Sequence, residues 1–387
     1  MKIILFVLSL NTLVFALEIK TDVATNYINF TNFKDDVILD AANEIIYKNK
    51  DFEITSKLHL LYSAQYNEKR YLSFKELFIS KEYENYAFKL GKIIKFLGEL
   101  EGYNVADVFN QKDYLYDPFD KSAKSGAYAF LLTKYIEENS LELGIKFYEE
   151  DKKFPKLSSP YALPFSYNEE LLLSAKRYTP TIHLNYSFTT DELVESETKF
   201  IIQHGYDNKR YFTNTTPTTL TQYAYRVNKF ILTSNILYED TIFKLESSYT
   251  NVVDEKKVSD YAQLSFGIEN NLYDIKGFDI TFYNEYYKYF YKNKSLLKNI
   301  DISEVYNNDI FSALRLNFND TKSSELRGGV LYDLDNSESV LKFDIKSRIK
   351  DGLVLKAQLL KIVAKKDSVL TPVGNHTRFR FWLTYIF

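Results

Sequence analysis

The 387-residue sequence predicts an all-β chain that closes into a transmembrane antiparallel β-barrel of about 16–18 strands. Three observations predict this fold. Apolar and polar residues alternate with a period of two, no segment after the N-terminus could be a membrane-spanning helix, and the last strand keeps one apolar face up to the final residue. The composition is unusual only in its 17% aromatic residues, which include 33 Tyr and 30 Phe but one Trp. Aromatic girdles at the two membrane interfaces of a barrel explain this excess.

Alternation with a period of two recurs along the body of the chain. In the run 182–188, Ile, Leu, Tyr and Phe take every second position, with His, Asn and Ser between them. Successive side chains of a strand point to opposite faces, so each run has one apolar and one polar face. Similar runs occur at 54–66, 141–148, 243–249, 278–282, 314–318, 341–345 and 353–359.

The connections between these runs differ in length. Many are short polar turns, which are typical of antiparallel neighbours joined by hairpins. Short turns at one rim and long loops at the other are typical of a membrane barrel. A soluble exported sandwich is the alternative, but it rarely needs so many long strands in one domain. The longer irregular segments are 94–125, 149–168, 207–220 and 292–308.

The first sixteen residues predict a secretory signal peptide. Lys2 precedes an apolar run, and Val14-Phe15-Ala16 allows cleavage after Ala16. The run is shorter than the ~20 residues that a spanning helix needs, which disfavours a membrane anchor. We therefore expect residues 1–16 to be removed and residues 17–387 to form a single barrel, with no room ahead of it for a plug or passenger domain.

The composition excludes several classes of chemistry. The absence of Cys excludes a disulfide scaffold, thiolate metal sites and a cysteine nucleophile. The formal net charge of −3 gives no reason to expect a nucleic-acid partner. No phosphate-binding glycine loop or nucleophile elbow is present. We expect no enzymatic activity, cofactor or metal, because the four histidines lack metal-ligand spacing: His59, His183, His204 and His376.

The C-terminal strand carries a perfectly alternating apolar face. A soluble edge strand is normally blunted by charge or proline, whereas this face continues to the last residue. It resembles the C-terminal assembly signal of Gram-negative outer-membrane barrels, and the resemblance implies recognition by the barrel-assembly machinery. The residues of this signal are Phe381, Leu383, Tyr385 and Phe387.

Residues 89–113 contain a second resemblance. Two glycines are followed by Asp, Asn and Asp at a spacing that resembles a strand-to-loop segment of bacterial porin-like outer-membrane proteins. Those relatives often have Trp before the second glycine and Pro after the asparagine, where this chain has Leu97 and Gln111. The resemblance implies a channel-forming barrel and leaves the subfamily open.

Residues 94–125 are a candidate constriction. Glycine permits a bend as a strand leaves the wall, and Asp and Asn fix local turns, so this segment could fold into the lumen and narrow it. An external surface loop with ordinary turns remains an equal alternative. The candidate constriction residues are Glu99, Asp107, Asn110, Asp113, Asp117 and Asp120.

Arginines supply the candidate pore lining. Inside a lumen they would favour anions and carboxylate groups, and the acidic segment 94–125 could oppose them across a narrow opening. The alternative is that charged residues simply avoid lipid. Six of the nine arginines fall on predicted polar faces: Arg226, Arg315, Arg327, Arg348, Arg378 and Arg380.

These features predict a porin-like channel for passive diffusion of small hydrophilic solutes across a bacterial outer membrane, with a possible preference for anionic or carboxylate-bearing ones. The alternatives are a closed or substrate-dedicated barrel and a surface adhesin or structural barrel. The expected partners are outer-membrane lipid, the assembly machinery and the solutes. The sequence leaves monomer and homotrimer open.

Overall fold

The computed structural model describes residues 17–157, 159–162, 166–191, 194–216, 219–253, 255–293, 306–366, 368, 370–371 and 373–387. The predicted signal peptide of residues 1–16 lies outside these described residues. In the described part, no helix is long and apolar enough to cross a membrane.

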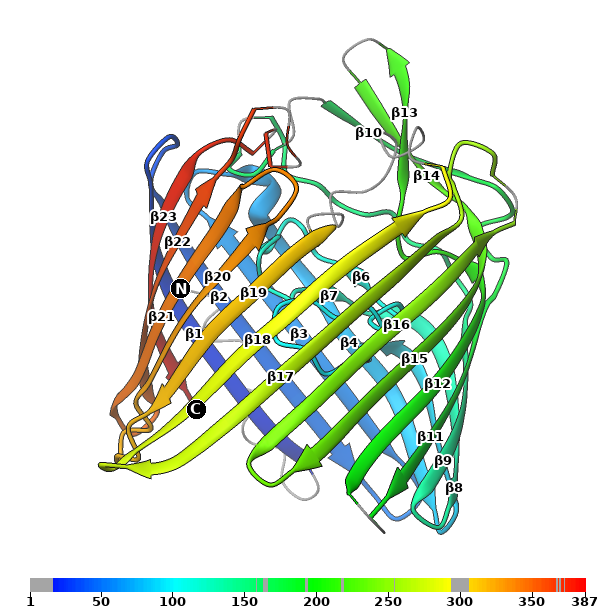
Figure 1. The fold of residues 1–387 in the computed structure, drawn as a ribbon, viewed down its shortest axis with the longest axis horizontal. Coiled ribbons are helices and arrows are strands. Elements are labelled where there is room, and N and C mark those ends of the chain that lie inside the picture. The colour runs from blue at the N-terminus through cyan, green and yellow to red at the C-terminus, as the bar shows by residue number, and fades with distance from the viewer. Residues whose placement is uncertain are drawn as a thin grey trace.

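Eighteen strands form one closed antiparallel barrel, in which each strand pairs with the next wall strand along the chain (Figure 1). The prediction of a barrel of about 16–18 strands is therefore confirmed. The wall consists of β1 (Leu17–Phe30), β2 (Asp36–Lys48), β3 (Glu53–Ser63), β4 (Arg70–Tyr83), β5 (Tyr86–Ile93), β8 (Ala127–Ile136), β9 (Asn139–Lys146), β11 (Thr181–Thr190), β12 (Glu195–Tyr206), β15 (Arg226–Tyr238), β16 (Thr241–Val252), β17 (Tyr261–Ile275), β18 (Phe278–Tyr291), β19 (Asn308–Asn317), β20 (Glu325–Asp333), β21 (Ser339–Lys350), β22 (Leu353–Val363) and β23 (His376–Ile386).

The barrel closes where the first strand meets the last. β23 pairs antiparallel with β1 in a register that places Phe381 opposite Tyr27. Beyond the strand, the Phe387 amide donates to the Thr21 carbonyl at 2.9 Å. Closure leaves no wall strand with an unpaired edge, which is the condition for a sheet to lie in hydrocarbon.

The two faces of each wall strand differ as the alternation predicts. In β15, Phe230 points outward and is 53% exposed, whereas Lys229 and Ile231 point into the lumen and are buried. The alternating residues of β23 also point outward, with Phe381, at 37%, the least exposed of those from Phe379 to Phe387. The outside of the barrel is thus an apolar belt, and the charged residues of the wall are mostly lumenal.

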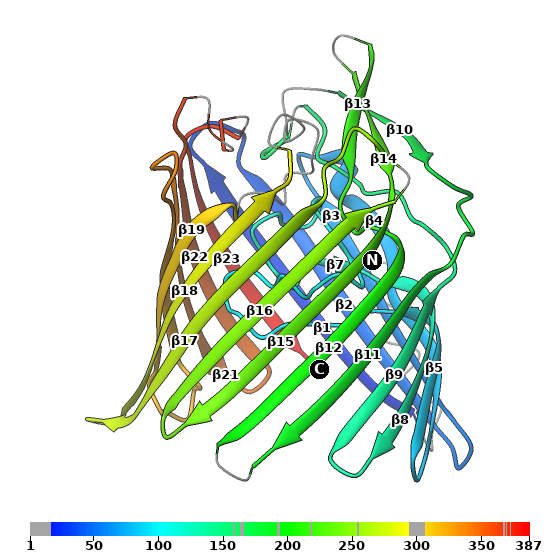
Figure 2. The same cartoon turned by 45° about the vertical axis from the view of Figure 1, so that its right-hand side comes forward.

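The two rims of the barrel differ. At one rim, the turn end, the connections are short (84–85, 137–138, 239–240, 276–277 and 351–352), and β1 begins and β23 ends there. At the other rim, the loop end, strands are joined by the longer connections, which are 94–126, 147–180, 207–225 and 292–307. Figure 2 shows the small sheet of β10 (Ser166–Leu173), β14 (Thr219–Ala224) and β13 (Tyr211–Thr216) at the loop end, where β13 projects beyond the wall.

Candidate functional site

Residues 94–126, here called the lumenal loop, run inside the barrel. Its short hairpin, β6 (Gln111–Lys112) paired with β7 (Lys124–Ser125), is enclosed by the wall strands in Figure 1. An apolar cluster holds the loop to one side of the lumen. In this cluster, loop residues Leu97, Ala106, Val108 and Phe109 pack with lumenal wall residues that include Ile201 and Ile231.

Lysines of the wall and of the loop itself hold three of the predicted constriction acids. The Lys199 ammonium lies 3.0 Å from the Glu99 carboxylate, and the Lys75 ammonium lies 2.5 Å from Asp113. Asp107 forms an ion pair with Lys124. These pairs fix the loop against the wall. They also neutralise Glu99, Asp107 and Asp113, whose negative charges were predicted to oppose the pore arginines across the lumen.

Asn110 and Asp120 shape the loop backbone. The Asn110 side-chain amide donates to the carbonyls of Ile93 and Ser125, and its oxygen accepts from the Lys95 amide at 2.7 Å. It therefore joins the two ends of the loop. The Asp120 carboxylate accepts from the amide and hydroxyl of Ser122 at 2.9 and 2.7 Å, which closes a local turn.

Asp117 is the one predicted constriction acid that contacts predicted pore arginines. Its carboxylate lies 2.9 Å from Arg378 and 3.8 Å from Arg380, and all three side chains are about 95% buried. The carboxylate also accepts the Phe119 amide at 2.9 Å. Burial alone would raise the pKa of Asp117, but the two guanidinium groups hold it well below its usual range.

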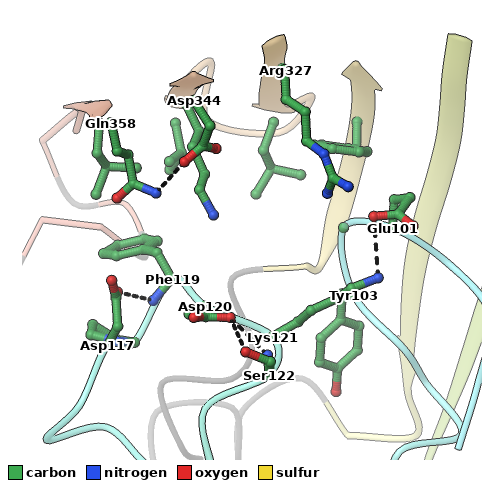
Figure 3. A pocket seen from close by; sticks show the side chains of 18 of the residues that line it. Glu101, Tyr103, Asp117, Phe119, Asp120, Lys121, Ser122, Arg327, Asp344 and Gln358 are labelled. Atoms are coloured by element: carbon green, nitrogen blue, oxygen red, sulfur yellow. Dashed lines mark hydrogen bonds and ion pairs between the residues drawn. The ribbon is translucent and has the colours of Figure 1, made fainter. Parts of the chain in front are cut away.

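A cavity of about 630 Å³ remains between the lumenal loop and the wall strands β18–β23. Figure 3 shows the two sides facing each other, with Tyr103, Phe119 and Asp120 on the loop and Arg327 and Asp344 on the wall. The loop is thus packed against one part of the wall, and the open part of the lumen lies against another.

Cations line the wall side of this cavity. We call Arg327, Lys342, Lys346 and Lys356 the basic wall. Arg327 pairs with Glu325 at 2.6 Å, and Lys356 lies 3.9 Å from Asp344. Among the described residues, no carboxylate lies within 4.0 Å of the Lys342 or Lys346 ammonium. These two lysines therefore present positive charge to the cavity without a direct ion pair to a described carboxylate.

The three lysines of the basic wall were not among the predicted pore-lining residues, which were all arginines. Their signal was available, because Lys342 and Lys346 share the lumenal face of β21 with Arg348. Neighbouring strands then bring the charges together: Arg327 lies opposite Asp344, and Lys346 lies opposite Lys356.

Five of the six candidate arginines lie on lumenal faces. Arg315 donates to the Thr281 hydroxyl at 3.2 Å, and Arg327 lines the cavity. Arg348 lies near the turn end of β21, while Arg378 and Arg380 contact Asp117 as described.

Arg226 does not lie in the lumen, contrary to the prediction. It shares the outward face of β15 with Phe230 and donates to His204 at 2.7 Å. The error has a physical cause. The inward residues Val227 and Ile231 are also apolar, because they pack on loop residues, so polarity does not distinguish the two faces here.

Aromatic rings complete the cavity lining. The Arg380 guanidinium lies 4.2 Å from the centre of the Trp382 ring, and the Lys356 ammonium lies 4.9 Å from it. Tyr103 and Tyr306 stack with centroids 4.7 Å apart. Flat apolar faces therefore lie beside fixed cations, an arrangement suited to organic anions. No group of three or more His, Asp or Glu in the described ranges could hold a metal ion.

Solved outer-membrane barrels have the same fold at low sequence identity. OprD from Pseudomonas aeruginosa is 10% identical with a TM-score of 0.58, and the match covers 96% of this chain and 94% of that chain. OccK11 (OpdR) of Pseudomonas aeruginosa is 10% identical with a TM-score of 0.57, over 96% and 95% of the two chains. OpdK of Pseudomonas aeruginosa, solved with vanillate, is 9% identical with a TM-score of 0.54, over 96% and 98%.

No protein-family model matches the sequence, and no curated protein is significantly similar to it. The structural comparisons establish the fold of this chain, a closed β-barrel of the outer-membrane type.

Proposed function

We propose that this protein is a bacterial outer-membrane channel through which small hydrophilic solutes diffuse passively, with a preference for anionic and carboxylate-bearing ones. The observation that carries the proposal is the cavity between the lumenal loop and the basic wall. Cations at a narrow opening attract anions and repel cations, and the opening limits solute size. In this reading residues 94–125 are the constriction, and no catalytic group or cofactor is needed.

The outer surface supports the membrane location. Its exposed residues are predominantly aromatic and aliphatic over the height of the strands, as in Phe230, Phe343 and Phe381. Barrel closure satisfies the backbone groups of the wall. A signal peptide at residues 1–16, and recognition of Phe381, Leu383, Tyr385 and Phe387 by the assembly machinery, would bring the chain to that membrane.

The preference for anions rests on Lys342 and Lys346. Both lack a carboxylate partner among the described residues, and both line the cavity. OpdK, which has the same fold, was solved with vanillate, a carboxylate that carries an aromatic ring. The fixed cations beside Trp382 would suit a solute of that general kind.

Planar-bilayer recording tests the proposal. The wild-type protein should give ohmic single-channel openings and a reversal potential that favours chloride in a KCl gradient. Replacing Lys342 and Lys346 with Gln should lower the chloride-to-potassium permeability ratio about twofold or more, because two positive charges leave the lining of the cavity. Lys361→Gln is the matched control, since Lys361 lies on the outward face of β22.

Each alternative has a distinct outcome in the same recordings. A wild-type protein without openings would refute the diffusion channel and favour a closed or substrate-dedicated barrel. An adhesin would conduct normally while loss of the loops at the loop end abolished attachment to cells. Deletion of residues 100–120 should raise the conductance, and an unchanged conductance would exclude a constricting role for the lumenal loop.

A further inference from the structure

The edge of the lumenal loop is held to the wall by carboxylates that accept backbone amides. Glu246 of β16 accepts from the amides of Glu99 at 2.7 Å and Ala106 at 3.0 Å. Glu285 of β18 accepts from the amides of Glu101 at 2.6 Å and Gly102 at 2.8 Å. Two lumenal carboxylates thus accept hydrogen bonds from four backbone amides within eight consecutive loop residues.

Tyr287 extends this contact by one residue. Its hydroxyl accepts the Tyr103 amide at 3.0 Å and donates to the Glu285 carboxylate. Glu246, Glu285 and Tyr287, together with the loop amides they accept, are called the amide anchor below. All three side chains are at most 4% exposed.

The amide anchor lacks any cation of its own. In the described part of the chain, no Lys, Arg or His nitrogen lies within 4.0 Å of the Glu246 or Glu285 carboxylates. The nearby Lys244 is paired with Glu269 at 2.7 Å and donates to the Glu99 carbonyl. A buried carboxylate without a cation needs hydrogen-bond donors, and the loop amides supply them. Docking of the loop and burial of these charges therefore depend on each other.

A close steric fit fixes the docked position. Gly267 lies opposite Glu285, and a Cβ at Gly267 would lie 2.5 Å from the Leu100 side chain. Leu100 is fully buried, so it fills the space that this glycine leaves. On the loop, a Cβ at Gly102 would lie 2.7 Å from the Tyr287 hydroxyl. The Leu100 side chain thus fits into the space above Gly267, and the acceptors Glu246 and Glu285 lie on the strands on either side of β17.

The anchored edge borders the open part of the lumen. Glu101, Gly102 and Tyr103 line the cavity across from the basic wall. At the opposite side of the cavity the loop is fixed differently, by the ion pairs of Asp117 with Arg378 and Arg380. The loop is therefore fixed at both sides of the cavity, and the amide anchor is the attachment at β16–β18.

We propose that Glu246 and Glu285 are positioning residues that hold the loop edge from Glu99 to Ala106 in place and thereby set the width and steadiness of the opening. This inference rests on the proposed channel function. It assigns to two wall carboxylates a role in solute passage, although neither needs to touch a solute.

Hydrogen exchange of the intact protein in detergent tests the anchor directly. Glu285→Gln places an amide NH₂ against the loop donors and should speed exchange at Glu101 and Gly102 about tenfold or more. Glu246→Gln should do the same at Glu99 and Ala106. Tyr287→Phe, a milder change, should release mainly the Tyr103 amide and serves if a Gln variant does not fold. Glu44→Gln is the control, because Glu44 of β2 pairs with Lys57 of β3 at 3.2 Å rather than with a loop amide.

Single-channel recording of the same variants tests the consequence. Loosening the loop edge should increase the open-channel current noise about twofold or more in the Glu246 and Glu285 variants and leave the Glu44 variant like wild type. Unchanged exchange at the four amides would overturn the anchor. Faster exchange with unchanged current in a conducting protein would overturn its role in the opening. A wild-type protein that does not conduct would refute the channel itself, and the exchange pattern would still decide whether the two carboxylates hold the loop.

Discussion

Replacing Asp117 with Asn would isolate the charge that fixes the lumenal loop to β23. The Asn side chain keeps an oxygen that can accept the Phe119 amide, so the change removes the negative charge and little else. Arg378 and Arg380 would then lie buried side by side with no carboxylate between them.

The magnitude follows from the geometry. With an effective dielectric constant of about 20, the attraction is about 6 kcal/mol at the 2.9 Å contact with Arg378 and about 4 kcal/mol at the 3.8 Å contact with Arg380. Desolvation of the three charges offsets much of this. Removing one partner of a buried pair typically costs about 3–5 kcal/mol, because a charge is left uncompensated. We expect a loss of that size in the free energy of unfolding.

Urea-induced unfolding in detergent micelles measures the effect. The control is Asp120→Asn, since the Asp120 carboxylate accepts hydrogen bonds from Ser122 of the same loop, and this change should alter stability by at most ~0.5 kcal/mol. The pKa of Asp117 is lowered in the folded protein, so its stabilisation is complete above its ordinary pKa and is lost as the pH falls through the depressed value. Wild type should therefore lose this contribution only in strong acid. If the Asp117 and Asp120 variants were equally stable, the ion-pair argument would be refuted.

Three further predictions concern charge and assembly. Burial lowers the pKa of Lys112, on the loop side of the cavity, to about 8. The chloride preference of wild type, measured as the reversal potential, should therefore fall between pH 7 and pH 9 as this lysine loses its proton. Lys112→Gln should remove this pH dependence. Arg226→Ala should leave ion selectivity unchanged because Arg226 is on the outward face, whereas Arg327→Ala should reduce the preference for anions; equal shifts would contradict the assignment of faces. Deleting Phe387, which bonds Thr21 where the barrel closes, should lower the yield of membrane-inserted protein in cells while the purified chain still refolds in detergent, and normal insertion in cells would count against the assembly signal.

Local alternation was sufficient to predict the wall. The period of two in runs such as 182–188 and the apolar face from Phe379 to Phe387 are properties of single strands, and both appear in the structure as outward faces. The same signal failed at Arg226. There the inward face is apolar as well, because it packs on a loop that is distant in sequence. Alternation identifies faces only where the two faces meet different surroundings.

The sequence by itself therefore determined a closed barrel with long loops at one rim. The two faces of each strand follow from the alternation within that strand, and the short turns imply antiparallel neighbours. Only the tertiary structure decided that residues 94–126 lie inside the lumen. It also decided that Asp117 meets Arg378 rather than facing it across an opening, and that Lys342 and Lys346 line the cavity with no carboxylate of the described residues within 4.0 Å. These outcomes depend on pairings between residues on strands and loops far apart in the chain. Glu246 and Glu285 show the reason most clearly. Nothing in their own strands distinguishes them from other lumenal glutamates, and their hydrogen bonds to the amides of Glu99 and Glu101 exist only in the folded barrel.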